Sequence, residues 1–189
     1  MGSEMCIRDR VATEQNRNED GSFATRPAAR EITVHDLLTH MSGIGYVFSS
    51  ATDLDKAYLE ANLLLTEGTL EDRINIIAGL PLYNDPGKVW SYSFSTDVLG
   101  RVIEAASGMS LEAYLKENIF DPLGMDRTEF FLDESDFEGL ATVVEFNEAG
   151  EMTRAAGNAL STGVNDEAFG IMSGGAGLVS SVDLSLIHI

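Results

Sequence analysis

One tyrosine, Tyr92, lies where a reactive side chain is often presented. It follows a Pro86-Gly87 turn and a short apolar stretch ending at Trp90, and it directly precedes a predicted helix. Loops held by a rigid element carry a disproportionate share of catalytic and binding residues. A tyrosine hydroxyl ordinarily has a pKa of about 10, so it acts as a base near neutral pH only beside a cation. Taken alone, a half-buried structural aromatic is the simpler interpretation, and only neighbouring motifs favour chemistry.

Two serine-nucleophile motifs are absent from the chain. In Ser-x-x-Lys a serine precedes a lysine by three residues, but here those positions are Asp53, Asp85 and Ala113. Gly-x-Ser-x-Gly, the nucleophile elbow of α/β-hydrolases, does not occur either. A serine attacks an acyl carbon only when an adjacent base takes its proton. The sequence therefore holds a candidate acid–base residue without the nucleophile that it would serve.

The histidines and the single cysteine do not predict a metal site. The chain has Cys6 and three histidines, His35, His40 and His188. His35 and His40 are five residues apart, whereas two ligands on one helical face stand at i and i+4. We interpret His40 as a structural histidine that bonds local backbone, and we expect no metal and no cofactor.

Two further clusters have simpler explanations than binding. The acidic run within residues 133–138 could hold a cation loosely, but a solvated loop explains it as well. Gly174–Gly177 lacks the Lys-Ser/Thr of a phosphate-binding loop. We expect these glycines to allow close backbone packing near the floor of a pocket.

The composition excludes some partners. Against 31 Asp+Glu there are only 12 Lys+Arg, a formal net charge of −19. Nucleic acid needs a basic face, and an anionic membrane surface attracts basic segments, so neither is an expected partner. No apolar run approaches the ~20 residues that a membrane span requires. At 189 residues and 44% hydrophobic composition, the chain suits one globular domain or part of a larger one.

Apolar periodicity and capping signals predict five helices. Thr33-x-x-Asp36 and Thr69-x-x-Asp72 have the spacing of a capping box, with aspartate in place of glutamate. Gly43 is expected to provide a left-handed cap for the first helix. The predicted helices are Thr33–Met41, Leu54–Thr66, a third from Thr69 to Ala78, a fourth capped by Ser95 or Thr96 and ending at Gly108, and a short fifth from Ser110 to about Ile119.

The remaining segments predict a small β part. Residues 11–30 are polar and indicate a loop or a short hairpin. Glu129–Leu132 and Ala141–Phe146 alternate like strands, and Asn147–Gly150 indicates a hairpin turn into Glu151–Arg154. The fold class predicted from these elements is α+β, mostly helical, with a small β-hairpin.

Both ends of the chain differ in character from the middle. Ser3–Arg10 (SEMCIRDR) and Leu184–Ile189 (LSLIHI) resemble translated sequencing-adapter read-through. We therefore expect residues 1–10 and 184–189 to be non-native and residues 11–183 to be a partial domain.

Four blocks, in a consistent order, resemble the serine β-lactamase-related hydrolases, a family that includes class C β-lactamases, DD-peptidases and family VIII carboxylesterases. The first, EITVHDLLTHMSG, contains a segment similar to the family's LLTHTSG, and the second contains its tyrosine motif. The blocks are Glu31–Gly43, Pro86–Ser93, the pair Leu99–Gly108 and Ile119–Met125, and Ser173–Ser181.

The resemblance implies a β-lactamase/transpeptidase-like fold and an acyl-enzyme mechanism without metal or cofactor. In that mechanism a Ser-x-x-Lys serine is the nucleophile, the lysine helps take its proton, and a tyrosine, here Tyr92, completes the acid–base relay. The family places Ser-x-x-Lys upstream of the Leu-Leu-Thr-His block and its last motif beyond Asp183. The chain would therefore keep the helical lobe and lack much of the antiparallel sheet.

The resemblance also implies a substrate class. Trp90, Phe94 and Ser95 are candidates for the wall of the substrate pocket. Phe94 stands where β-lactamases and DD-peptidases often carry an asparagine that hydrogen-bonds a substrate amide, which favours esters. The expected function is a carboxylesterase, with an inactive isolated chain. The alternatives are a β-lactamase or DD-peptidase-type amidohydrolase and a non-catalytic ligand-binding relative.

Overall fold

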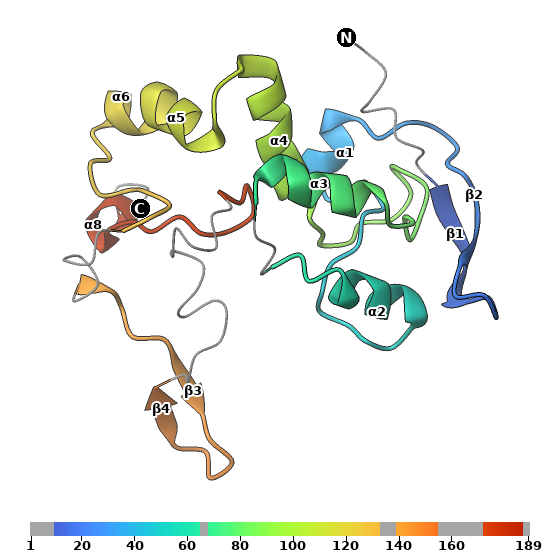
Figure 1. The fold of residues 1–189 in the computed structure, drawn as a ribbon. Coiled ribbons are helices and arrows are strands. Elements are labelled where there is room, and N and C mark those ends of the chain that lie inside the picture. The colour runs from blue at the N-terminus through green and yellow to red at the C-terminus, as the bar shows by residue number, and fades with distance from the viewer. Residues whose placement is uncertain (1–9, 65–67, 133–138, 155–171, 187–189) are drawn as a thin grey trace.

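Short helices dominate the structure, and two small hairpins complete it (Figure 1). The computed structural model describes residues 10–64, 68–132, 139–154 and 172–186. Its elements are β1 (Arg10–Arg17), β2 (Phe23–Pro27), α1 (Val34–Leu38), α2 (Asp53–Glu60), α3 (Leu70–Ala78), α4 (Ser95–Ser107), α5 (Leu111–Leu115), a π-helical turn (Lys116–Phe120), α6 (Asp121–Leu123), β3 (Val144–Phe146), β4 (Met152–Arg154) and α8 (Val182–Leu186). The described sheets are two antiparallel pairs, β1–β2 and β3–β4, so the predicted α+β class with a small β part is confirmed.

Three helices begin with the same device. At the start of α1, α2 and α3 a threonine hydroxyl accepts a hydrogen bond from the N–H three residues later, and the aspartate at that position accepts one from the threonine N–H. This reciprocal arrangement satisfies N–H groups that have no partner within the helix. Two of the three were predicted, and the one at α2 was not. The pairs are Thr33/Asp36, Thr52/Asp55 and Thr69/Asp72.

Some predicted boundaries are wrong. α1 ends at Leu38, before the expected cap at Gly43, and the chain turns through His40, which has a positive φ of 54°. α2 ends at Glu60 and not at residue 66. α4 has no side-chain cap, because the hydroxyl of its first residue, Ser95, turns inward to other serines.

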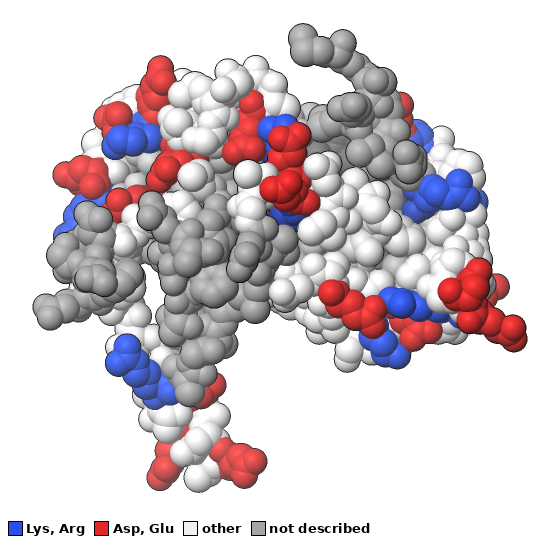
Figure 2. All heavy atoms as spheres, in the orientation of Figure 1, with Lys and Arg blue, Asp and Glu red and all other residues white. Residues whose placement is uncertain are grey.

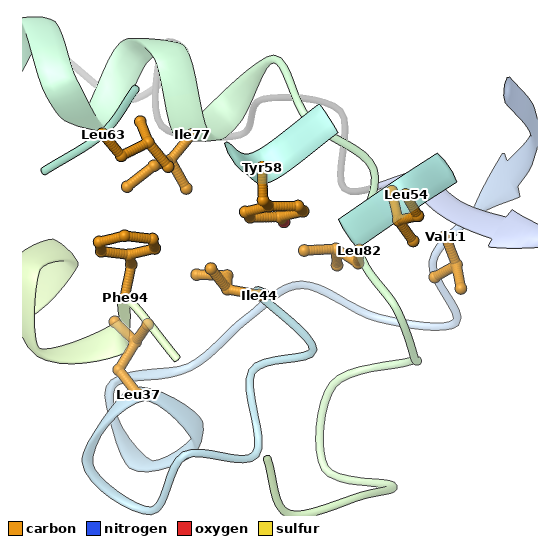
Figure 3. Packing of buried hydrophobic residues seen from close by; sticks show 9 residues of the cluster. All are labelled: Val11, Leu37, Ile44, Leu54, Tyr58, Leu63, Ile77, Leu82 and Phe94. Atoms are coloured by element: carbon orange, nitrogen blue, oxygen red, sulfur yellow. The ribbon is translucent and has the colours of Figure 1, made fainter. Parts of the chain in front are cut away.

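The main core lies where α1, α2, α3 and the start of α4 meet β1. Tyr58 and Leu54 of α2 are completely buried, and the Phe94 ring faces Leu63 and Ile77 in the close view of Figure 3. Burial of each large apolar side chain contributes about 1.5–3 kcal/mol. The buried members are Val11, Leu37, Ile44, Leu54, Tyr58, Leu63, Ile77, Leu82 and Phe94. The core thus forms a floor beneath the segment that carries Tyr92.

Helix α4 is held against a glycine segment from near the end of the chain. A Cβ on Gly174 would collide with the Thr96 carbonyl oxygen and would lie 3.2 Å from the Gly100 nitrogen. The Ser173 hydroxyl donates to Asp97 Oδ1, and Arg73 of α3 lies 3.3 Å from the same oxygen. The expected close packing of these glycines is therefore confirmed at Gly174.

The hairpins follow the turn signals only in part. The polar stretch 11–30 forms the β1–β2 hairpin, and Asn147–Gly150 connects β3 to β4 as predicted. Figure 1 shows β3–β4 extending away from the helices. The strand predicted at Glu129–Leu132 is wrong, because Glu129 makes only an isolated bridge to Val179.

Both predicted domain boundaries fall inside elements. β1 begins at Arg10, and α8 extends to Leu186.

In the described part of the chain, no helix has the length and apolar character needed to cross a membrane. In the view of Figure 2, acidic side chains are spread over several regions of the face and interleaved with Lys and Arg.

Candidate active site

The loop that carries Tyr92 runs alongside the segment that follows α1. Four backbone hydrogen bonds join residues 83–94 to residues 40–45, so the two segments are held together along their length. The bonds are Tyr83 N to Gly43 O (2.8 Å), Gly87 N to Met41 O (2.7 Å), Ser91 N to His40 O (2.9 Å) and Phe94 N to Gly45 O (3.2 Å).

Two ion pairs anchor the entrance to this loop. Arg26 binds Asp85 through both guanidinium nitrogens, at 2.9 and 2.7 Å, and this pairing lowers the pKa of the Asp85 carboxyl to about 2. Arg30 binds the buried Asp36 in the same two-pronged way, at 2.6 and 2.8 Å. Gly87, with φ of +80°, lies so close to Arg30 that a Cβ would collide with its Nη2. The turn before Tyr92 therefore packs against residues at the start of α1.

Tyr92 itself lies in a group of aromatic rings. Its ring stacks on His40 with centroids 4.8 Å apart and on Phe48 at 5.7 Å, and it meets the edge of Tyr46 at 5.2 Å. Tyr92 is 42% exposed, Phe48 79% and Trp90 66%. A half-exposed tyrosine with three aromatic partners has a restricted orientation and remains accessible to a small molecule.

A chain of buried hydroxyls lies beneath this group. His40 Nδ1 is 3.3 Å from the Ser93 hydroxyl, Ser93 is 2.6 Å from Ser95, and Ser95 is 2.8 Å from Ser42. The three serines are completely or almost completely buried. They are therefore structural hydrogen-bonding groups and not exposed nucleophiles. The expected local backbone partner of the His40 ring is corrected to the side chain of Ser93, which is distant in sequence.

The structure separates the four predicted site residues into two pairs. Tyr92 and Trp90 reach the surface, and both rings contact His40, whose ring centroid is 6.5 Å from that of Trp90. Phe94 and Ser95, expected in the pocket wall, are 1% and 0% exposed. The Phe94 ring packs against Tyr46 with centroids 4.4 Å apart, so it supports the aromatic group from the core side.

Burial and charge shape the surroundings of the aromatic group. Burial raises the pKa of Tyr46, and the nearby Tyr92 and Asp97 add to that increase. Burial lowers the pKa of Arg73, although the adjacent Asp97 opposes this. Hydrogen bonds from Arg30, reinforced by Thr33, hold the pKa of Asp36 far below its usual range.

Two hollows in the described part of the chain lie away from Tyr92. One of about 170 Å³ opens between α4, α5 and the glycine segment, and its lining includes Leu99, Ile103 and Phe130. A second of about 840 Å³ lies between the β1–β2 hairpin and α2, with Arg17 and Glu60 in its lining. Tyr92 is not among the residues that line either of them.

Several sequence expectations lie outside the described residues. These include Cys6, His188 and the acidic run at residues 133–138. Among the described residues, no three His, Cys, Asp or Glu side chains gather as metal ligands would.

Three contributors to the group around Tyr92 were not predicted: the ring contacts of His40, and Tyr46 and Phe48. Tyr46 and Phe48 follow the Ser42-Gly43 turn within six residues, which was the available signal. Their role depends on the pairing of residues 40–45 with residues 83–94, which local sequence does not reveal.

The family model described as beta-lactamase matches residues 9–183. The chain belongs to the beta-lactamase family. A likeness to solved structures supports the β-lactamase/transpeptidase-like fold. Unliganded simvastatin synthase (LovD) from Aspergillus terreus aligns with a TM-score of 0.69 at 26% identity, covering 98% of this chain and 42% of that one. EstCE1, described as a hydrolase with promiscuous acyltransferase activity, aligns with a TM-score of 0.66 at 25% identity, covering 89% of this chain and 46% of that one.

Curated relatives in this family include an esterase and acyltransferases. Esterase EstB of Burkholderia gladioli is 36% identical over 96 residues, which is 50% of this chain and 24% of EstB. Monacolin J acid methylbutanoyltransferase of Aspergillus terreus is 36% identical over 117 residues, 61% of this chain and 27% of the transferase. The matched residues thus cover about a quarter of the length of these relatives.

Proposed function

We propose that this chain carries the tyrosine part of a serine hydrolase that works through an acyl-enzyme, with esters as its substrates. The observation that carries the proposal is the placement of Tyr92. Its half-exposed ring stacks on both His40 and Phe48, shortly before α4, within the part of the chain that matches the family.

In this proposal Tyr92 is the acid–base group of the relay. A serine and a lysine from a Ser-x-x-Lys motif would be the nucleophile and its first proton acceptor, and that motif is not among these 189 residues. The buried Ser42, Ser93 and Ser95 do not replace it, because a substrate carbonyl cannot reach them. We therefore expect the isolated chain to be inactive, and activity to need residues that this chain does not contain.

The position of Phe94 bears on the class of substrate. Phe94 points into the core, so its difference from asparagine does not act through a direct contact in this structure. The preference for esters is supported instead by relatives named as esterases. The exposed rings of Trp90 and Phe48, next to Tyr92, offer an apolar surface for the acyl or alcohol part of such a substrate.

Acyl transfer is the second candidate. Several relatives carry the names of acyltransferases, and EstCE1 is described as having both activities. The two reactions share the acyl-enzyme and differ in whether water or an alcohol accepts the acyl group. The amidohydrolase alternative has weaker support, from a penicillin-binding protein homologue of Pyrococcus abyssi that aligns with a TM-score of 0.52 at 29% identity.

The test uses a longer protein that contains these residues together with an upstream Ser-x-x-Lys. We expect it to hydrolyse a short-chain p-nitrophenyl ester faster than a chromogenic β-lactam. Mass spectrometry of the quenched reaction should show one acyl group on the motif serine. Adding a small alcohol should divert part of the product to a new ester if acyl transfer operates. Turnover without an acylated serine, or a clear preference for the β-lactam, would contradict the proposal.

A further inference from the structure

His40 contacts three consecutive residues of the Tyr92 loop in three different ways. Its carbonyl oxygen accepts a hydrogen bond from Ser91 N at 2.9 Å. Its ring stacks on Tyr92 with centroids 4.8 Å apart and an interplanar angle of 25°. Its Nδ1 lies 3.3 Å from the hydroxyl of Ser93. One residue therefore holds the backbone before Tyr92, the ring of Tyr92 and the side chain after it.

The Nδ1 edge of the His40 ring meets the buried hydroxyl chain. Ser93 bonds Ser95, and Ser95 bonds Ser42, which lies two residues after His40. The Ser42 hydroxyl also accepts a hydrogen bond from Ile44 N at 3.2 Å. The hydroxyl that His40 meets is thus itself held by other buried serine groups, and linked hydrogen bonds of this kind restrain the groups at their edge. The imidazole plane is thereby restrained on the face of Tyr92.

The backbone of His40 is in a conformation that a histidine rarely adopts. Its φ is 54°, in the left-handed region where glycine is favoured and a side chain is not. Such conformations cluster at functional sites, where the rest of the structure holds them in place. Glycine would suit this backbone better, so the imidazole is present despite a local cost.

We propose that His40 is a positioning residue for Tyr92, setting the orientation of the phenol ring toward the substrate. The proposal rests on the proposed function, in which Tyr92 is the acid–base group. His40 acts through orientation and not as a proton acceptor for Tyr92, because stacking places the imidazole on the face of the phenol ring and Nδ1 bonds Ser93.

Three variants test the proposal in the longer protein that carries Ser-x-x-Lys. His40→Gly removes the imidazole ring and places at this position the residue that best tolerates a left-handed backbone conformation. His40→Asn tolerates the left-handed conformation and offers an amide to Ser93. Asn62→Gly is the matched control, because Asn62 has a similar φ of 51° but lies in the turn after α2.

We expect His40→Gly to lower kcat about 10- to 100-fold with KM changed less than about twofold, because a small misplacement of a catalytic group is that costly. Its thermal midpoint should change little, because relief of the left-handed backbone offsets the lost side-chain contacts. His40→Asn should recover part of kcat, and Asn62→Gly should leave kcat unchanged. In the 189-residue chain, the ring protons of Tyr92 should lose the imidazole's part of their ring-current shift in His40→Gly, while the parts from Phe48 and Tyr46 remain.

Two results separate the possible failures. If Tyr92→Phe abolishes turnover but His40→Gly leaves kcat intact, the positioning role is overturned and the proposed function stands. If Tyr92→Phe turns over normally, the proposed function fails and the positioning role fails with it. A loss of kcat in His40→Gly that only parallels a loss of folded protein, or unchanged Tyr92 ring shifts, also overturns the positioning role.

Discussion

Replacing Asp36 with asparagine should destabilise the start of α1, against which the Tyr92 loop packs. Asp36 Oδ2 accepts three hydrogen bonds, from Arg30 Nη1, Thr33 N and Thr33 Oγ1, and Oδ1 accepts one from Arg30 Nη2 at 2.8 Å. The single oxygen of an asparagine would take the place of Oδ2 and keep the capping box. Its amide group would then face the Arg30 donor, so one charged hydrogen bond and the ion pair would be lost.

The magnitude follows from the unequal exposure of the two partners. The side chain of Asp36 is 3% exposed and that of Arg30 is 44% exposed. Hydrogen bonds to charged groups contribute about 1.5–3 kcal/mol when buried. Because Arg30 can turn partly to water, the lower end applies, and we expect a loss of about 1.5–2 kcal/mol in the free energy of unfolding. Asp72→Asn is the matched control, because Asp72 has the same capping position on an exposed surface. It should change stability by less than about 0.5 kcal/mol.

Urea denaturation of the 189-residue chain, followed by circular dichroism and by Trp90 fluorescence, measures both variants. The pKa of Asp36 is lower in the folded chain, so the charged form contributes stability above the ordinary aspartate pKa of about 3.9. That contribution decreases as the pH falls toward the folded pKa. The gap between wild type and Asp36→Asn should therefore be constant above about pH 5 and narrow in more acidic solution. Equal losses in the two variants, or a gap that widens in acid, would refute the reasoning.

Further predictions concern packing and activity. Gly174→Ala should destabilise the chain by about 1–3 kcal/mol, because its Cβ would meet the Thr96 carbonyl. Gly139→Ala should be tolerated, because the space beside Gly139 is open. A comparison of the thermal midpoints of the two variants tests this. Phe94→Ala should cost about 3–5 kcal/mol, and Phe48→Ala far less because Phe48 is 79% exposed; urea midpoints of the two variants decide this. The isolated chain should release no nitrophenol above the buffer rate, and measurable ester turnover by it would contradict the assigned dependence on Ser-x-x-Lys.

Local signals in the sequence predicted most elements but not their exact ends. The boxes at Thr33 and Thr69 start α1 and α3 as predicted, because capping depends on residues only three apart. The end of α1 was misplaced, because His40 takes a left-handed conformation under contacts with residues 91–93 that lie far away in the sequence. The cap at Ser95 failed for the same reason, since its hydroxyl bonds Ser42 across the core.

Sequence motifs predicted the family and singled out Tyr92, but they did not predict the side chains that surround Tyr92. Period and composition do not show that Phe94 points inward while Tyr92 points outward, because the loop has no regular alternation. They also do not show that Tyr46 and Phe48 reach Tyr92, which follows from the pairing of two distant loops. Tertiary contacts supply what local pattern lacks.

The central claim is that Tyr92 is the acid–base residue of an acyl-enzyme mechanism. Its most direct test is kcat/KM for a short-chain nitrophenyl ester in the longer protein with Ser-x-x-Lys, comparing Tyr92→Phe with Tyr114→Phe, a tyrosine of α5. The account predicts a loss of about 100-fold or more for Tyr92→Phe, the usual scale for a positioned acid–base group, and no loss for Tyr114→Phe. Equal turnover by Tyr92→Phe and the unsubstituted protein would contradict it.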